Sequence, residues 1–283
     1  MYLVFDIGAT KTRLAVSKDF QNLEKVVIFE TPQSYEAGIS SIKNYFSKLG
    51  GELKMVAGCL PGTFDAQKTH VLFSKNMPEW EGKPLKGDLE DFLKCPVYIG
   101  NDSSFAALGE AHLGAGIGKR VVAYLTISTG VGGKRVVDGK IDMVGSSYEP
   151  GYQIVDANFP AHLDFLQDRD KYPNGAAYLQ RLISGDDLQR RFKKDPKLIA
   201  DPVLWNEVAN YLAIGINNVI AMWSPDVVVL GGGIINAKRV DIQKINSLVR
   251  EYAIFVSEVP EVRFSKLGDK AGLVGGLKYL EQL

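Results

Sequence analysis

Short apolar runs alternate with turns over the first thirty residues. The runs YLVFDIG, TRLAVS and KVVIFE have the length of strands, and their spacing predicts an antiparallel meander. A helical pattern follows from Glu36 to Leu49, and the runs MVAGCLPG and PVYIGND then predict two buried strands that end on small or polar residues. Ser103 is expected to cap a helix that ends near His112.

A second cycle begins at Arg120. VVAYLTIS predicts a strand, STGVGG a turn, and KRVVDGKI a strand in which Asp138-Gly139 is a hairpin signal. Residues 155–200 show weak periodicity, DVVVLGGG is typical of a buried strand, and AGLVGGLKYLEQL predicts a terminal helix whose glycines permit close packing. A long core helix is expected from Leu204 to Trp223, with apolar residues at helical spacing at Val208, Leu212, Ile216, Val219 and Met222.

The size of the chain allows two domains. It has 283 residues, of which 46% are hydrophobic, enough to bury two modest cores. Because the arrangement of strand, glycine turn and strand occurs twice, we expect an α/β protein with a flexible joint at Gly114, Gly116 and Gly118.

Charge and cysteine content narrow the class of partner. Lysine plus arginine equals aspartate plus glutamate at 33 each, which leaves no basic excess to hold nucleic acid or an anionic membrane. No apolar run reaches the length of a membrane span, and MYLVFDIGAT lacks the basic start of a signal peptide. Cys59 and Cys95 lack the paired spacing of a zinc or redox motif, so they are interpreted as buried thiols, with a disulfide the less favoured alternative. We therefore expect a cytoplasmic protein that binds a small molecule.

Two turns combine glycine with hydroxyl residues after a predicted strand. In Asp6-Ile7-Gly8-Ala9-Thr10-Lys11-Thr12-Arg13, small residues let backbone amides approach a phosphate, and Asp6 can hold magnesium through water. The alternative is a tight hairpin in which Gly8 only supplies a positive φ angle. The second turn, Ser128-Thr129-Gly130-Val131-Gly132-Gly133, occupies the equivalent place in the second cycle. The pair predicts that one triphosphate is held by both turns, through Gly8, Thr10, Lys11, Thr12, Ser128, Thr129, Gly130 and Gly132.

A third glycine cluster, Gly231-Gly232-Gly233, directly follows the strand DVVVL. Its backbone can lie against an adenosine ring or ribose without side-chain obstruction, and a plain strand-to-helix turn is the alternative. The chain has no G-x-x-x-x-G-K-[ST], and no G-x-G-x-x-G at a strand end, which argues against a P-loop enzyme and against a dinucleotide oxidoreductase.

The two phosphate turns, the LPG run, the Asn101-Asp102 pair and the late VLGGG together resemble the ROK family of sugar kinases and sugar-responsive repressors. The resemblance covers nearly the whole chain and implies an actin-like, ribonuclease H-like duplicated α/β fold with a cleft between two domains. It also implies ATP and magnesium as cofactors, a small N-terminal domain over residues 1–115 that the C-terminal helix 271–283 joins, and a larger domain over 116–270. Ala9 stands where the family usually has a second glycine.

Asn101-Asp102 matches the position of the family's catalytic aspartate. A carboxylate there can take the proton from the sugar hydroxyl while that oxygen attacks the γ-phosphoryl group. An aspartate before Ser103 is also a common helix cap, so only its location gives Asp102 this role.

The segment Lys75-Asn76-Met77-Pro78-Glu79-Trp80 resembles the part of the family in which an asparagine, here Asn76, bonds a sugar hydroxyl and the tryptophan packs beneath the loop. A surface turn fixed by Pro78 is the alternative. A sugar site needs several convergent donors and acceptors, and the chain offers Asn76, Asn101, Asp102 and Glu149, with Gly62 and Thr63 expected to line the same pocket.

The chain departs from the family at its zinc motif. Where the family has E-x-G-H, this chain has Glu149-Pro150-Gly151-Tyr152, so Tyr152 either supplies a hydroxyl to the sugar in place of the histidine or fills the core. Alignment on Ser184-Gly185 puts other residues at the three cysteine positions and at the sugar-binding glutamate, namely Lys171, Pro173, Tyr178 and Gln180. Neither cysteine replaces the missing ligands, nor do His70, His112 and His162. We expect no zinc, and an amide contact from Gln180 to the sugar.

These observations predict transfer of the ATP γ-phosphoryl group to a hexose hydroxyl, with glucose first and N-acetylglucosamine or N-acetylmannosamine as the alternative. The rival hypothesis is a catalytically degenerate, sugar-binding regulatory protein of the same fold, which the lost zinc ligands favour and the retained Asp6 and Asp102 oppose. An acyl-phosphate-forming kinase would need a cationic pocket that the neutral Asn and Glu inventory does not suggest. Family repressors carry an N-terminal helix-turn-helix, whereas this chain starts on its first strand, so DNA binding is disfavoured. The oligomeric state stays open, with a homodimer among the alternatives.

Overall fold

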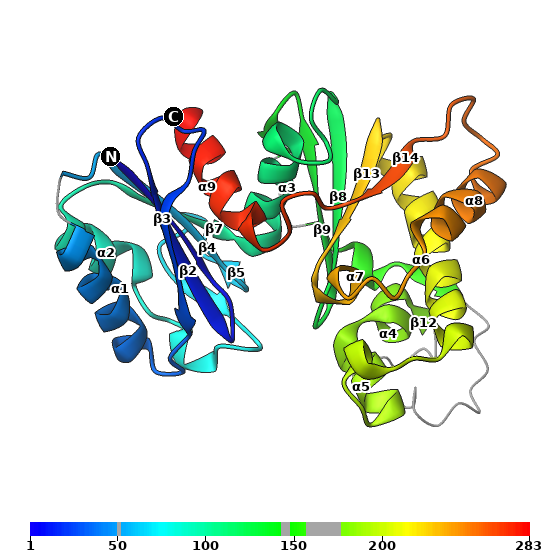
Figure 1. The fold of residues 1–283 in the computed structure, drawn as a ribbon, viewed down its shortest axis with the longest axis horizontal. Helices are drawn as coiled ribbons and strands as arrows, with labels where there is room; N and C mark the ends of the chain where they lie inside the picture. The colour runs from blue at the N-terminus through cyan, green and yellow to red at the C-terminus, as the bar shows by residue number, and fades with distance from the viewer. Residues whose placement is uncertain (50–51, 143–147, 157–176) are drawn as a thin grey trace. The chain divides into compact units, whose positions relative to one another are not determined.

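A computed structural model describes residues 1–49, 52–142, 148–156 and 177–283. The chain divides into two compact units, which Figure 1 shows as ribbons: unit 1 comprises Met1–Leu113 with Asp269–Leu283, and unit 2 comprises Gly114–Gly268. Each unit contains a five-stranded sheet with helices packed against it.

Unit 1 is built on a sheet in the order β3-β2-β1-β4-β7. The first three strands pair antiparallel, which confirms the predicted meander, and β1, β4 and β7 pair parallel. The strands of this unit are β1 (Tyr2–Ile7), β2 (Lys11–Ser17), β3 (Glu24–Glu30), β4 (Met55–Leu60), the short β5 (Thr63–Phe64) and β6 (Val71–Phe73), and β7 (Val97–Asn101). Its helices are α1 (Tyr35–Leu49), the 3-10 turn η1 (Pro78–Trp80), α2 (Leu85–Leu93), α3 (Asp102–Leu113), η5 (Gly268–Lys270, which begins at the end of unit 2) and α9 (Ala271–Glu281).

Both faces of β1 are buried, because successive side chains point to opposite faces of a sheet. Leu3 and Phe5 belong to a cluster with Ile42 of α1, whereas Val4 packs in a separate cluster with Leu273 of α9. The sheet of unit 1 is therefore covered on its two faces by helices from opposite ends of the chain.

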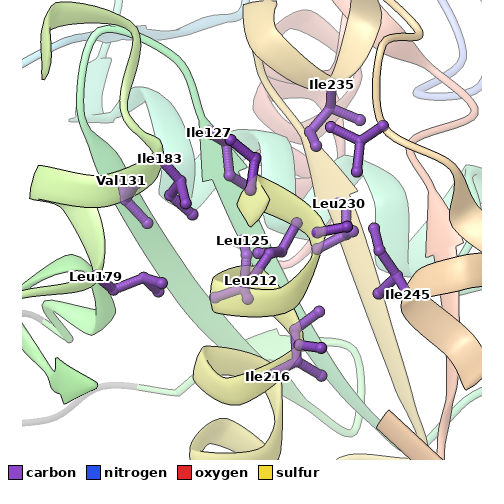
Figure 2. Close-up of a cluster of buried hydrophobic side chains, with 14 of the residues drawn as sticks. Leu125, Ile127, Val131, Leu179, Ile183, Leu212, Ile216, Leu230, Ile235 and Ile245 are labelled. Carbon is purple, nitrogen blue, oxygen red and sulfur yellow. The ribbon is translucent and has the colours of Figure 1, made fainter. Parts of the chain in front are cut away.

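Unit 2 repeats this plan with a sheet in the order β10-β9-β8-β13-β14. Its strands are β8 (Val121–Ile127), β9 (Val131–Val137), β10 (Lys140–Ile141), β11 (Ile154–Asp156), β12 (Ala177–Tyr178), β13 (Val227–Gly231) and β14 (Glu261–Phe264). Its helices are η2 (Pro150–Tyr152), α4 (Leu179–Ile183), α5 (Gly185–Phe192), η4 (Pro196–Leu198), α6 (Pro202–Trp223), α7 (Gly233–Asn236) and α8 (Ile242–Tyr252). Figure 2 shows part of its core, where Leu212 and Ile216 of α6 lie among Leu125 of β8 and Leu230 of β13.

Most of the local predictions hold. The hairpin at Asp138-Gly139 is confirmed, since both residues have positive φ angles, 49° and 73°, as its tight turn requires. Cys59 and Cys95 are free thiols, the first buried and the second half-buried. None of the helices in the described parts of the chain has the length and apolar character needed to cross a bilayer.

Three predictions were wrong in detail. Met222 is 76% exposed, because in the last turn of α6 the neighbouring Ile220 and Trp223 face the core and Met222 does not. Val131 begins strand β9, so the second glycine turn is shorter than predicted. Ser103 lies inside α3, and its amide donates to Oδ1 of the capping residue Asn101 at 3.0 Å and also to Oδ1 of Asp102 at 2.7 Å.

The terminal helix α9 packs against α3 through glycines, as its sequence suggested. A Cβ atom built on Gly275 would lie 1.7 Å from the carbonyl oxygen of Phe105, and one on Gly109 would lie 2.5 Å from that of Ala271. The two backbones approach so closely that a single methyl group would force the helices apart.

We therefore expect Gly275→Ala to lower the free energy of unfolding by about 2–4 kcal/mol, the cost of overpacking a rigid contact. Gly87→Ala in α2 is the matched control, because no atom lies within 4 Å of the added Cβ. There the better helix propensity of alanine should raise stability by about 0.5–1 kcal/mol. Urea titration of the three proteins measures both changes, and a similar effect of the two substitutions would contradict the close contact.

Candidate active site

The candidate catalytic carboxylates of unit 1 lie at one edge of its sheet. Asp6 pairs in register with Cys59 on β4, and Leu60 pairs with Asn101 on β7. Because β1, β4 and β7 are parallel, their carboxyl ends meet at this edge, with β1 and β7 about 10 Å apart across two strand spacings. Asp102 follows β7 directly as the first residue of α3.

Asp6 is poorly solvated, with 17% of its side chain exposed. Burial raises the pKa of this carboxyl from 3.8 to about 6, the negative charge of Asp102 adds to the rise, and Arg13 and the Cys59 thiol oppose it. The Arg13 guanidinium lies 3.9 Å from Asp6 and bonds Asp269 more closely, at 2.6 Å. Asp6 therefore carries its charge at neutral pH at a cost in stability that the nearby cation only partly offsets.

The start of α3 is fixed by the amide of Asn101. Its Nδ2 donates to the carbonyl of Gly62 at 3.0 Å, and its Oδ1 accepts from the hydroxyl and the amide of Ser103. Gly62 has φ +146°, and a Cβ there would lie 2.6 Å from the Phe73 carbonyl oxygen, so this turn requires glycine. The side chain of Asn101 thus holds the Gly62 turn beside Asp102.

The turn between β1 and β2 is closed by the amide of Gly8, which donates to the carbonyl of Lys11 at 2.9 Å. Gly8 is not among the glycines with positive φ, so its proposed alternative role in the hairpin is wrong. Thr10 and Lys11 are exposed at the tip. Thr12 is buried, and its hydroxyl bonds that of Thr31 at 2.9 Å. Of the predicted phosphate ligands here, Thr10 and Lys11 remain accessible, and Thr12 supports the turn from inside.

The segment around Asn76 is anchored by Trp80. The indole is 1% exposed, donates to the carbonyl of Gln33 at 3.2 Å, and packs so closely on α1 that a Cβ on Gly38 would lie 2.3 Å from it. Asn76 itself is exposed, as is Thr63 of β5. The tryptophan lies beneath the loop that presents Asn76, in the manner the sequence predicted.

In unit 2, the second glycine turn meets two other segments. The carbonyl of Ser128 accepts from the amide of Gly185 at 2.7 Å, and that of Thr129 accepts from Asp186 at 3.1 Å. A Cβ on Gly232, which has φ +95°, would lie 2.3 Å from the Ile127 carbonyl oxygen, so only glycine fits.

The neighbouring glycines differ in the space beside them. A Cβ on Gly233 would lie 3.7 Å from the Ser128 hydroxyl and 3.8 Å from the Lys197 ammonium. Gly231 is pressed against Tyr124, whose hydroxyl would lie 2.3 Å from an added Cβ, while Gly132 has only the methyl of Thr126 at 3.4 Å. One hydroxyl and one cation thus lie beside Gly233.

The predicted sugar ligands of unit 2 lie on two adjoining segments. Glu149 precedes the η2 turn and Tyr152 is its last residue. Both are exposed, Tyr152 by 49%, so the alternative in which Tyr152 fills the core is wrong. Tyr152 contacts Tyr178 edge to face, at 6.3 Å between ring centroids. Gln180 of α4 reaches the phosphate turn, because its Oε1 lies 3.6 Å from the position of a Cβ on Gly130.

A divalent cation fits the unit 1 edge. Asp6 and Asp102 repel each other, and a cation held by Asp6 would offset both that repulsion and the desolvation of Asp6. Magnesium is commonly bound by one or two carboxylates together with substrate phosphates. Among the described residues there is no group of three or more His, Cys, Asp and Glu side chains placed to hold a metal. Three of the residues considered for zinc lie outside the described residues, namely Lys171, Pro173 and His162.

Within unit 1, the structure brings Asp6, Gly62, Asn101 and Asp102 to one edge of the sheet. Within unit 2, it places the glycine turn that begins at Ser128 beside Gly233 and Gln180. The sequence did not indicate Lys197 or the ion pair of Arg13 with Asp269. Lys197 comes from a segment without periodicity, and Asp269 joins the site from the far end of the chain. No local signal could have found either.

The chain is similar in sequence and fold to proteins of one family. The model of the ROK family matches residues 2–282. An N-acetyl-D-glucosamine kinase from Escherichia fergusonii is 31% identical over 310 residues, covering 97% of each chain. A ROK hexokinase from Thermus thermophilus is 28% identical, with a TM-score of 0.83 over 99% of this chain and 98% of that one. A ROK family glucokinase from Streptomyces griseus, solved with glucose and AMPPNP, has a TM-score of 0.75 at 23% identity over 100% of this chain and 99% of that one. The predicted actin-like, ribonuclease H-like α/β fold is confirmed.

The raised pKa of Asp6 predicts that substitution of this residue increases stability by an amount that depends on pH. Between the unfolded value of 3.8 and about 6 the folded state binds the extra proton, so stability is lost as pH rises through this window. Asp6→Asn removes this loss of stability, so we expect it to raise the free energy of unfolding at pH 8 by on the order of 2 kcal/mol, with roughly half of that gain at pH 5. Urea titrations at the two pH values measure the difference.

Asp65 provides a control of opposite sign. Hydrogen bonds from the His70 amide and from Thr69 lower the pKa of the Asp65 carboxyl to about 2. The ionised carboxylate therefore stabilises the folded state above the pKa of the unfolded chain, and this stabilisation is lost only in acid. Asp65→Asn should therefore reduce stability at pH 8. A loss of stability in both variants at pH 8 would contradict the account of Asp6.

Proposed function

Because this chain belongs to the ROK family and is an ATP-dependent sugar kinase of that family, we propose that it transfers the γ-phosphoryl group to a hexose hydroxyl with Asp102 as the base. The observation that carries the proposal is the position of Asp102, at the start of α3 and electrostatically coupled to Asp6. A carboxylate at this place can accept the hydroxyl proton while its neighbours hold the reactants.

The base needs a fixed position more than an unusual pKa. Asn101 bonds both the start of α3 and the Gly62 turn, so the sugar-facing backbone and the base are set by one amide. Since phosphoryl transfer depends mostly on positioning and charge stabilisation, such rigidity favours catalysis. Asn76 and Thr63, both exposed in unit 1, are proposed to bond sugar hydroxyls with Gly62.

Asp6 is proposed to hold magnesium through water. Bound there, the ion would offset negative charge on the phosphate oxygens. Asp6 contributes a full negative charge at pH 7.5, above its pKa of about 6, and Arg13 keeps the carboxylate oriented without neutralising it in a close pair.

Unit 2 is proposed to supply further nucleotide contacts. The Ser128 hydroxyl is proposed to contact phosphate, and the backbone of Gly232 and Gly233 the adenosine, with Gly231 packed behind them against Tyr124. Lys197 joins this set as a cation beside Gly233.

Glucose is proposed as the first substrate, with N-acetylglucosamine the second candidate. The second is favoured by a specific observation, the 31% identity to an N-acetyl-D-glucosamine kinase over 97% of the chain. Glu149, Tyr152 and Gln180 are proposed as the ligands that decide between them. Location in the cytoplasm and assembly as a homodimer are expectations of the same proposal, and analytical ultracentrifugation tests the assembly.

A coupled ADP-release assay over glucose, mannose, N-acetylglucosamine and N-acetylmannosamine tests the activity. Loss of a general base commonly costs 10²–10⁴-fold, so we expect Asp102→Ala to reduce kcat by roughly 10³-fold for the preferred sugar. Titration calorimetry should show that the variant still binds that sugar.

Asp91→Asn is the control, because Asp91 is exposed on α2 and outside the proposed site. It should retain wild-type kcat. ADP release by the wild type that does not exceed the Asp102→Ala background with any of the four sugars would reject the kinase activity. Sugar binding without turnover would then favour the sugar-binding regulatory protein.

A further inference from the structure

Gln153 follows the η2 turn and makes hydrogen bonds in two directions. Its side-chain Nε2 donates to the carbonyl of Pro150 at 2.8 Å, within the turn, and its Oε1 accepts from Nδ2 of Asn218 in α6 at 2.8 Å. One half-buried amide therefore joins the turn to the long core helix of unit 2.

The backbone of Gln153 fixes a second segment. Its carbonyl accepts from the amide of Leu179 at 3.0 Å, at the start of α4. Leu179 is fully buried and packs against α6 at Gly215, which has no side chain to obstruct it. A Cβ on Gly215 would lie 2.5 Å from the leucine and 3.3 Å from Nε2 of Gln153. Gln153 and Leu179 thus occupy the same gap in α6, and Gln180 follows immediately.

The turn itself is pressed against the sheet. A Cβ on Gly151 would lie 2.3 Å from the carbonyl oxygen of Val131, and one on Gly133 would lie 2.8 Å from Pro150. These contacts restrict movement of the turn toward β9. The bond to Asn218 adds a restraint toward α6, the helix against which Leu179 also packs.

We infer that Gln153 is a positioning residue for sugar binding, one that holds the turn bearing Glu149 and Tyr152 and the helix bearing Gln180 in fixed relation to α6. The inference rests on the proposed function. Gln153 acts through the segments that it connects and not through contact with the sugar, and its loss weakens sugar affinity while the base and the nucleotide ligands stay in place.

Gln153→Met tests the inference, since methionine has the same chain length without the two side-chain hydrogen bonds. We expect the KM for the preferred sugar to rise about tenfold, with the KM for ATP unchanged and kcat within threefold of wild type. Asn218→Leu removes the same bridge from the other side and should give the same change. The double variant should be no worse than either single variant, because all three lack one shared bond.

Asn246→Leu is the matched control. Asn246 also bridges two elements of unit 2 through its amide, bonding both the carbonyl and the amide of Val262 at 2.8 Å and 2.9 Å. It should lower thermal stability without changing the KM for sugar. Hydrogen exchange should show loss of protection at Leu179 in Gln153→Met and Asn218→Leu, and retained protection there in Asn246→Leu.

The results distinguish a failure of the proposed function from a failure of the role inferred for Gln153. A wild type that releases no ADP with any sugar overturns the proposed function, and this inference with it. An active wild type whose sugar KM does not change in Gln153→Met and Asn218→Leu overturns the inference alone. An equal rise in sugar KM in Asn246→Leu also overturns it, because general loosening of unit 2 would then explain the effect.

Discussion

Parallel pairing of β1, β4 and β7 is the constraint on which the candidate active site depends. Strands that run in the same direction bring their carboxyl ends to one edge, so residues far apart in sequence, Asp6 and Asp102, become electrostatic neighbours. Unit 2 uses the same device with β8 and β13, where Gly231 pairs with Thr126 just before the Ser128 turn. Each unit thus presents its polar groups beyond the ends of its parallel strands.

This arrangement has an energetic cost that is concentrated at Asp6. A carboxylate between buried strands and beside a second carboxylate is less stable when charged, which its raised pKa expresses. Arg13 relieves only part of this cost, because its closer partner is Asp269. A site of this kind gains from a bound cation what the folded chain alone lacks. Gly62 and Gly232 let their turns pack against neighbouring carbonyl groups where a side chain would not fit.

The sequence predicted what local patterns determine. Strand alternation gave the meander, and the Asp138-Gly139 signal gave the hairpin, because both depend on neighbouring residues. The cap of α3 could not be decided, since Asn101 and Ser103 are both good cap residues and only the course of the backbone selects Asn101. Met222 follows the apolar spacing of α6, yet it is exposed because Trp223 beside it faces the core instead. The resemblance to the ROK family supplied the site residues that no local pattern could join.

The candidate residues of the two units are held in different ways. Asp6 and Asp102 are placed mainly by strand register, which many backbone hydrogen bonds determine and which single side-chain changes seldom alter. The segments of Tyr152 and Gln180 depend in addition on a bridge between side chains 65 residues apart. Both residues also differ from the ROK pattern that the sequence resembles. Substitutions at that bridge can therefore move these two segments while the carboxylates of unit 1 keep their places.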